Sequence, residues 1–448
     1  MDTLKKKYGL WTAIAMVVGI VIGSGVFFKA ELILNKTGGN LPLGILAWII
    51  GGMIMIICAY VFSVMATKYE YVNGVVDYAE VIVGKGYAYY IGWFLTIVYF
   101  PAITSVLAWV SARYTCVLFG WSIAGGECMT IAGLYLVGIY ALNALSPVLA
   151  GKFQVSTTFI KLVPLLLMAV AGTVVGLLNG VTVENFTTVV STDVEGNPLL
   201  KAVVSTAFAY EGWIVATSIN AELRDAKKNL SLALVAGSFI IVCVYILYYI
   251  GLAGAASNQV MMEQGEQGVR LAFGNIFGNF GGLLFIFVII SCLGTLNGLM
   301  MGSTRGMYAL AARNSGPKPN LFAQVDKGTN MPANSSVIGL LMCALWLFFF
   351  YGANLTEGMF GRFGFDSSEL PIVALYAFYI PIFARFMQKE KELPAFKRFV
   401  MPALAIICCV FMVIAAYFAH QDTMIWFLIV FAAAMAIGAL FYGKGNKK

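Results

Sequence analysis

Two apolar stretches of this chain each carry a polar interruption near their middle. Residues 22–27 read IGSGVF, and residues 208–213 read FAYEGW. Two glycines around a serine weaken a helix by roughly 1 kcal/mol each relative to alanine. Backbone N–H groups freed at such a break could hold an anion, most naturally a carboxylate, at the N-terminus of a half-helix. Close packing of helices through small residues is the competing explanation for this pattern.

The second interruption is marked by the carboxylate of Glu211. A carboxylate in the middle of a membrane costs roughly 2.5–3.5 kcal/mol, so such a residue faces protein or water and usually has a task. Contact with the amine of a substrate and transfer of a proton are two such tasks. A structural ion pair, or a protonated and hydrogen-bonded acid, would also account for Glu211.

The third group that could do chemistry is Lys161, which lies well inside the apolar run 153–178. At ~1.5 Å per residue its ammonium would be ~13 Å deep, close to the middle of a membrane. A buried ammonium could take the place of a bound sodium ion, or it could release its proton. A static pair with Glu211 is the alternative, and Pro164 should bend this helix.

The elements that must position these groups are apolar runs, each long enough to cross a ~30 Å hydrocarbon core as a helix. Of the 448 residues, 60% are hydrophobic and 11% are charged, and the mean hydropathy is +0.87, which excludes a large soluble protein. Strand-like alternation of the barrel kind is absent. Twelve runs cover residues 10–34, 42–66, 88–112, 129–149, 153–178, 199–219, 232–254, 273–302, 336–353, 368–387, 399–419 and 422–442.

The distribution of positive charge predicts the orientation. Twelve spans put both termini on one side, and that side carries 21 of the 28 basic residues against six on the other. This bias predicts that both termini are cytoplasmic. The net charge of +7 then needs no nucleic-acid partner. The apolar run after Lys5–Lys7 is too long for a signal peptide, so we expect it to be the first span.

The two interrupted runs, spans 1 and 6, are separated as two five-span repeats would require, and an odd number of spans forces the second copy to be inverted. We therefore expect an all-α membrane protein with a single transmembrane domain over residues 1–448. Residues 10–387 would form the 5+5 core with discontinuous helices 1 and 6, and residues 388–448 would add helices 11 and 12 and a cytoplasmic tail. Paired interruptions of this kind are typical of transporters with a substrate site at the membrane midplane.

The sequence lacks the signature motifs of other functional classes. There is no Walker sequence, so direct drive by ATP is not expected. The eight cysteines form no C-x-x-C pair, and His420 is the single histidine, so we expect no metal site and no cofactor. Without a nucleophile elbow or paired catalytic carboxylates, we do not expect an enzyme.

A further motif, SCLGTLNG at residues 291–298, brings small and hydroxylated side chains into span 8. Taken together, IGSGVF, the lysine in QVSTTFIKL (154–162), FAYEGW, SCLGTLNG and STRGMYALAARNSGPKP (303–319) resemble the amino acid–polyamine–organocation superfamily. Within it, the set is similar to the L-amino-acid transporter group and its bacterial relatives, over spans 1 to about 10. The resemblance implies a sodium-independent amino acid carrier with the LeuT-like inverted-repeat fold.

The resemblance also implies roles for individual residues. The span 1 backbone would hold the substrate carboxylate, the span 6 backbone near Ala209 and Tyr210 would take the α-ammonium, and Phe208 would be an aromatic gate. Lys161 would stand where sodium binds in sodium-coupled relatives and would touch the span 1 backbone and Ser291, with Tyr245 looking towards it. The expected substrate-binding set is Ile22, Gly23, Ser24, Gly25, Phe208, Ala209, Tyr210 and Glu211. The expected gating and coupling set is Phe208, Lys161, Tyr245 and Ser291.

The sequence also departs from the family pattern. Glu211 stands where animal relatives often carry a small residue, so the sequence leaves open whether the substrate is a neutral amino acid or a cation. Neither Cys116 nor Cys128 matches the cysteine through which animal relatives bind a heavy chain. We therefore expect no heavy-chain subunit, a monomer or weak dimer, and a location in a prokaryotic plasma (inner) membrane.

The expected function is secondary active transport of L-amino acids, by exchange or with a proton. A substrate zwitterion would bridge the two breaks, Phe208 would close the outer path, and the span 1 and span 6 bundle would rock against the rest. The partners are then the amino acid and the lipid bilayer. The alternative is a cationic amino acid, polyamine or amine transporter selected by Glu211, and a channel or sensor is a third possibility.

Overall fold

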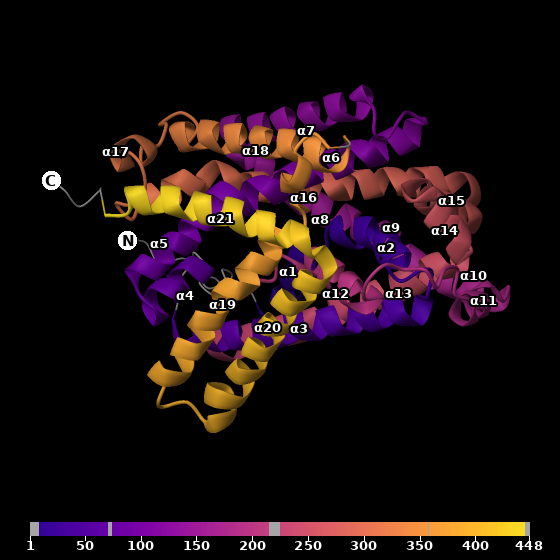
Figure 1. The fold of residues 1–448 in the computed structure, drawn as a ribbon, viewed down its shortest axis with the longest axis horizontal. Helices are drawn as coiled ribbons and strands as arrows, with labels where there is room; N and C mark the ends of the chain where they lie inside the picture. The colour runs from indigo at the N-terminus through magenta and orange to yellow at the C-terminus, as the bar shows by residue number, and fades with distance from the viewer. Residues whose placement is uncertain (1–8, 70–73, 215–224, 357, 444–448) are drawn as a thin grey trace. The chain divides into compact units, whose positions relative to one another are not determined.

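The computed structural model describes residues 9–69, 74–214, 225–356 and 358–443. Every regular element within these ranges is a helix (Figure 1). The α-helices are α1 (Leu10–Val21), α2 (Gly25–Lys36), α3 (Leu41–Lys68), α4 (Val75–Ile82), α5 (Lys85–Phe94), α6 (Phe100–Phe119), α7 (Gly126–Leu145), α8 (Pro147–Ile160), α9 (Leu162–Leu167), α10 (Thr173–Leu178), α11 (Val181–Thr187), α12 (Pro198–Tyr210), α13 (Ala226–Ala255), α14 (Asn258–Gln264), α15 (Glu266–Phe277), α16 (Gly281–Ala311), α17 (Pro319–Phe322), α18 (Ala333–Asn354), α19 (Leu370–Lys389), α20 (Met401–His420) and α21 (Asp422–Phe441).

Apolar helices of membrane-spanning length make up most of this chain. Within the described ranges, ten helical stretches are long and apolar enough to cross a membrane, and the bent pair α1–α2 makes up to eleven. π-helical turns join α5 to α6 and α9 to α10 within single stretches. The sixth predicted span, 199–219, begins with the shorter apolar helix α12, and its end lies outside the described residues.

Several predicted span boundaries are displaced, and glycine and proline explain two of them. The eighth span was expected from residue 273, but α15 ends at Phe277 because Gly278 turns the chain with φ of 56°, and α16 begins only at Gly281. The fourth span was expected to reach residue 149. It ends at Leu145 because Pro147, which lacks an N–H group, starts α8 instead.

The chain divides into two compact units, each built from separate segments. The first unit comprises Met1–Ala88, Pro164–Gly281 and Ile372–Ala419, and the second comprises Tyr89–Val163, Gly282–Pro371 and His420–Lys448. Both interrupted elements, α1–α2 and α12, belong to the first unit. Lys161 and α16 belong to the second unit.

In the first unit the long helix α13 is the central packing element. It lies along α3 and also packs against α1 and α10, while α12 packs against α2 and α3 (Figure 1). Glycines on α3 allow this close approach. A Cβ atom on Gly51 would overlap Thr206 of α12, and one on Gly52 would overlap Val242 of α13. Small residues therefore hold α3 tightly against both neighbours.

The end of α3 is tied to the end of α19 by a buried carboxylate of the first unit. Glu390 is 2% exposed, and it accepts hydrogen bonds from the Lys68 ammonium and the Tyr69 hydroxyl. The polar stretch 67–87 begins at the end of α3, and the sequence predicts that it forms a short amphipathic segment. Its described part contains the short helix α4, whose apolar side chains are largely buried.

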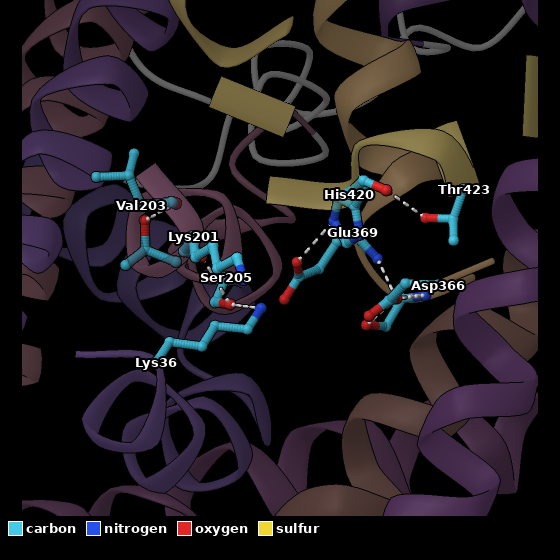
Figure 2. A network of polar contacts seen from close by, with 10 residues as sticks. Lys36, Lys201, Val203, Ser205, Asp366, Glu369, His420 and Thr423 are labelled. Atoms are coloured by element: carbon cyan, nitrogen blue, oxygen red, sulfur yellow. Dashed lines mark hydrogen bonds and ion pairs between the residues drawn. The ribbon is translucent and has the colours of Figure 1, made fainter. Parts of the chain in front are cut away.

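In the second unit α6 packs against α7 and α18, and hydrogen bonds link further helices. The indole of Trp93 donates to the carbonyl oxygen of Ala434 at 2.9 Å, which attaches α21 to α5. At the end of α20, the imidazole of His420 lies 3.2 Å from the carboxylate of Glu369, and the backbone N–H of Glu369 donates to Asp366 (Figure 2). Glu369 is fully buried, so the single histidine of the chain is the neighbour of a buried acid.

Candidate functional site

The first interruption lies between α1 and α2, which are bent by 53° relative to each other. α1 ends at Val21, Ile22 is extended with ψ of 113°, and α2 begins at Gly25. Ser24 is fully buried at the N-cap, and its side chain makes no capping hydrogen bond. The first N–H groups of α2, and the positive end of its dipole, therefore face the break.

The second interruption lies at the C-terminal end of α12. Phe208, Ala209 and Tyr210 form the buried last turn, and Glu211 is extended with ψ of 152°. Gly212 then adopts φ of 108°, a conformation that residues with a side chain rarely take. α12 therefore stops with its carbonyl groups and the negative end of its dipole at the break.

The two interruptions meet at Gly25. A Cβ atom on Gly25 would lie 2.6 Å from the Cα of Ala209 and 3.2 Å from the carbonyl oxygen of Phe208. Only a hydrogen atom fits in that space, so the start of α2 packs directly against the end of α12. Close packing, one of the two explanations for the glycines, thus applies to Gly25. It also brings opposite ends of two helix dipoles together.

The hydroxyl group of Tyr245, on α13, reaches both helix ends. It lies 3.3 Å from the carbonyl oxygen of Val21 at the end of α1 and 3.1 Å from that of Ala209 in α12. The backbone of Gly23, inside the break, also lies close to this hydroxyl. The sequence predicts that Tyr245 looks towards Lys161, which belongs to the other unit, and that contact stays a prediction. The position of Tyr245 between the ends of α1 and α12 was not predicted from the sequence.

Aromatic rings fix Tyr245 and Tyr210 in place. The two rings stack with centroids 5.2 Å apart, and the indole of Trp48 meets both edge-on at 5.5 and 5.6 Å. The Tyr210 hydroxyl donates to the carbonyl oxygen of Trp48 at 2.9 Å. The Tyr210 side chain is therefore held against α3 by this hydrogen bond and ring contact.

Phe208 is packed among α2 side chains, and one of them is a lysine that the sequence analysis missed. The rings of Phe208 and Phe28 meet edge-on at 5.9 Å, and the Lys29 ammonium lies 5.1 Å from the centroid of each. Lys29 is 0% exposed. Its only signal in the sequence is a lysine inside the first apolar run, and it is one of the six basic residues that the charge distribution assigns to the far side of the membrane.

Lys29 is expensive to bury. An ammonium inside a membrane span is costly, up to roughly 2.5–3.5 kcal/mol at the centre on insertion scales. Each cation–π contact returns about 0.5–2 kcal/mol, and the rings of Phe28 and Phe208 supply two of them. A lysine kept in such a place, one helical turn from the first break, is a candidate functional residue.

Glu211 directly follows α12 and is half-buried. It interacts electrostatically with Tyr376 and Tyr379 of α19, within the same unit. Lys161, the partner suggested by the sequence, belongs to the second unit, and the pair stays a prediction. The carboxylate thus follows the end of α12 and interacts with two tyrosines of α19 through its charge.

Lys161 separates α8 from α9 in the second unit and is 3% exposed. The interruption follows from Pro164, which has no N–H group to donate to the carbonyl of Ile160. Ser291 of α16 is fully buried, and its hydroxyl has no hydrogen-bond partner among the described residues. The expected contact between Lys161 and Ser291 stays a prediction.

The polar residues of the SCLGTLNG motif link helices of the second unit. The amide of Asn297 accepts a hydrogen bond from Asn143 at 2.8 Å and donates to Gln154 at 2.9 Å. A Cβ atom on Gly294 would overlap Thr157. Helix packing, the common use of such a motif, therefore accounts for Gly294 and Asn297.

Residues 8–441 match the family model described as amino acid permease. The chain belongs to the amino acid permease family. It is similar to the serine/threonine exchanger SteT of Bacillus subtilis, with 25% identity over 99% of this chain and 98% of that protein. It is also similar to the b(0,+)-type amino acid transporter 1 of Homo sapiens, with 25% identity over 98% and 88% of the two chains. The cystine/glutamate transporter of Homo sapiens is 25% identical over 74% and 66%.

Membership of the amino acid permease family agrees with the resemblance stated from the motifs, and it makes this chain a multi-pass membrane transporter and not an enzyme. The bent pair α1–α2 and the helix α12 of this permease belong to one compact unit. The residues around their junction, with Tyr245 and Lys29, are the candidate site.

Proposed function

We propose that this permease exchanges L-amino acids across the plasma membrane without sodium, and that the amino acid binds where α2 begins against the end of α12. The observation that carries the proposal is the contact at Gly25, which places the positive end of one helix dipole beside the negative end of another. A zwitterion carries the two complementary charges. Whole-length similarity to an exchanger and to an amino acid transporter supports the same activity.

In this proposal the carboxylate accepts hydrogen bonds from the backbone between Ile22 and Gly25. The α-ammonium donates to carbonyl oxygens at the ends of α1 and α12, where the Tyr245 hydroxyl already lies. Phe208 closes over the bound substrate. Binding of this kind uses the ends of interrupted helices, as in other transporters with a midplane site.

The wider architecture is part of the proposal. We expect twelve spans in a 5+5 inverted repeat with two added helices, with α12 and the residues after it as the sixth span. Both termini would be cytoplasmic. Both interrupted helices belong to one compact unit with α3 and α13, which supports their moving as one body during transport. Lys161 would substitute for a sodium ion, and no heavy chain would be needed.

The test is counterflow in proteoliposomes containing the purified protein. Radiolabelled amino acid outside should enter faster when unlabelled amino acid is inside, and replacing sodium by choline should change nothing. A channel shows no such trans-stimulation. Gly25→Ala should lower the exchange rate at least about tenfold, because its Cβ would meet the α12 backbone. The control is Gly133→Ala, where a Cβ meets nothing within 4 Å.

Lys161→Ala tests the sodium-substitute role separately. Exchange should fall, or should become dependent on sodium, because the fixed charge is gone. Unchanged transport with unchanged sodium independence would remove Lys161 from the machinery.

Glu211 supports a second candidate, the transport of cationic amino acids or polyamines, because a half-buried carboxylate directly follows α12 at the proposed site. Competition decides between the two. If arginine or putrescine inhibits uptake far better than alanine, leucine or phenylalanine, the substrate is a cation and the neutral amino acid reading is wrong.

A further inference from the structure

Two cysteine thiols of the first unit lie beside each other on helices that are far apart in the sequence. Cys58 of α3 and Cys409 of α20 place their sulfur atoms 4.0 Å apart, and both side chains are fully buried. Neither thiol is part of a disulfide. Burial alone is ordinary for a cysteine, which often serves as a small hydrophobic residue. The second thiol at that distance is a further observation, because it pairs two soft ligands.

The spacing suits a cation that binds two thiolates in line. A metal–sulfur bond is about 2.3 Å long, so two bonds in line span about 4.6 Å, slightly more than the distance between these sulfur atoms. Within the described residues, no group of three or more His, Cys, Asp or Glu side chains could hold a metal ion. Zinc, which takes four ligands in structural sites, therefore does not fit. The softer cations that prefer thiolate ligands remain.

The buried position selects the charge of the cation. Each thiol loses its proton when it binds, so two thiolates balance a divalent cation and leave no net charge. A monovalent cation would leave one negative charge, which is costly away from water. Mercuric chloride meets both conditions, because HgCl2 and two thiols give a neutral mercury bis-thiolate and two HCl. HgCl2 is itself uncharged, so it can enter an apolar interior.

The thiol pair is a neighbour of groups near the candidate site. Both cysteines interact electrostatically with Tyr376 and Tyr379 of α19, and these two tyrosines interact in the same way with Glu211. A cation held by both sulfur atoms would join α3 to α20 beside these tyrosines. Because α3 also packs against α12 and α13, such a bridge would hold the helices of the proposed site in one arrangement.

We infer that Cys58 and Cys409 form an inhibitory site for soft divalent cations of the Hg2+ type, which stop transport by bridging α3 and α20. The cation is an inhibitor here and not a resident cofactor. Its binding stands on the two thiols, whereas the loss of exchange rests on the proposed function. Binding and inhibition are therefore measured separately.

The chain itself offers matched controls. Cys116 of α6 has Cys128 as its thiol neighbour in the second unit, and both side chains are buried. Cys116→Ala removes one thiol from that pair, just as Cys409→Ala removes one from the proposed site. Cys408, which precedes Cys409 and interacts electrostatically with Cys58, provides a second control through Cys408→Ala.

Inhibition is tested by counterflow in proteoliposomes with HgCl2 added. HgCl2 should stop exchange by the unmodified protein, and dithiothreitol should restore it. In Cys58→Ala and Cys409→Ala, the HgCl2 concentration that halves exchange should rise at least about tenfold, because one thiolate replaces two. Cys116→Ala and Cys408→Ala should stay as sensitive as the unmodified protein. Equal sensitivity of Cys409→Ala and the unmodified protein would overturn the inference.

Binding is tested by thermal unfolding in detergent. HgCl2 should raise the melting temperature of Cys116→Ala, because a cation that bridges only the folded chain stabilises it. Adding Cys409→Ala to that variant should abolish the rise. Methylmercury chloride has one position for a thiolate and should give no rise, so an equal shift with both mercury compounds would overturn the inference. This comparison in Cys116→Ala decides if Cys409→Ala does not fold. Absence of exchange with any amino acid would instead contradict the proposed function and leave the melting temperatures to test the site.

Discussion

At the scale of single residues, the polar groups at the break are held by neighbours that are themselves fixed. The Tyr245 hydroxyl reaches carbonyl oxygens of α1 and α12, and its ring stacks on Tyr210. Trp48 packs on both rings from α3. Preorganisation of this kind lowers the entropy cost of binding a small molecule, because few groups must be ordered when it arrives.

Tyr245→Phe should destabilise the protein by about 1–3 kcal/mol, because carbonyl oxygens at a buried helix end lose their donor. It should also raise the KM for the amino acid, since the ends of α1 and α12 are no longer joined. Thermal unfolding in detergent and counterflow measure the two effects. Tyr417→Phe, at an exposed tyrosine of α20, is the control and should change neither quantity.

Glu390 gives a prediction for pH dependence outside the membrane spans. Burial raises the pKa of its carboxyl group, but hydrogen bonds from Lys68 and Tyr69 outweigh burial and hold the pKa below its usual value. A depressed pKa in the folded state stabilises above the unfolded pKa, and this stability is lost as pH falls through the folded value.

Glu390→Gln should therefore lower the free energy of unfolding at pH 7 by about 1–2 kcal/mol, a modest figure because Lys68 is partly exposed to solvent. The difference between the two proteins should shrink as the pH is lowered below about 4, where the native carboxylate is also protonated. Denaturation at a series of pH values measures it. A difference that stays constant from pH 7 to pH 3 would show that the charge of Glu390 does not stabilise the fold.

Residue types alone indicated part of this site. Gly23, Gly25 and Glu211 stand out because they are costly in an apolar helix. Lys29 is equally costly, but it lies late in the first run, where a lysine is ordinarily a flanking charge. Its burial depends on α12 and Phe208, which are far away in the sequence. Residue type alone did not mark Tyr245, which only the resemblance named, because its partners are backbone carbonyl groups and every residue has one.

At the scale of elements, the proposed substrate site consists of helix ends in the first unit. α2 and α12 are held together at two levels, by the packing at Gly25 and by the Lys36 ammonium, which donates to the Ser205 hydroxyl at 2.6 Å (Figure 2). The helix runs themselves could be predicted from hydrophobicity. Their exact ends depended on single residues such as Gly278 and Pro147, whose effect a count of apolar residues does not include.

Gly212→Ala tests the end of α12. The backbone there has φ of 108°, and a side chain at such an angle costs on the order of 1–2 kcal/mol or more. We expect less folded protein and weaker exchange, because the chain would leave the break in another direction. Gly138→Ala, in open space on α7, should be neutral or stabilise by up to about 1 kcal/mol. Equal effects of the two changes would mean that the turn at Gly212 is unimportant.

At the scale of the whole molecule, the number of spans determines whether the two ends of the chain lie on the same side of the membrane. Within the described residues, ten helical stretches and the bent pair α1–α2 are long and apolar enough to cross a membrane, and we expect α12 with the residues after it to make the twelfth span. An even number puts both ends of the chain on the same side of the membrane. The excess of basic residues predicts that this side is the cytoplasm.

The test uses a fluorescent protein that matures only in the cytoplasm, fused to the N-terminus in one bacterial strain and to the C-terminus in another. Fluorescence then reports whether each end of the chain is cytoplasmic. Both fusions should fluoresce. Fluorescence from the N-terminal fusion alone would mean an odd number of spans, and α12 would then be a re-entrant element. An internal fusion after Gly120, between α6 and α7, should stay dark and serves as the control for the opposite side.

Tyr245 has one hydroxyl proton, and it faces two carbonyl oxygens. It can serve them only in turn or by sharing. In the proposed binding mode, an α-ammonium at the break would bring three more protons to these carbonyl oxygens, and its release would leave them with the single proton of Tyr245. If the amino acid binds there, proton counting favours the loaded carrier over the empty one, and a carrier of that kind exchanges its cargo instead of returning without it.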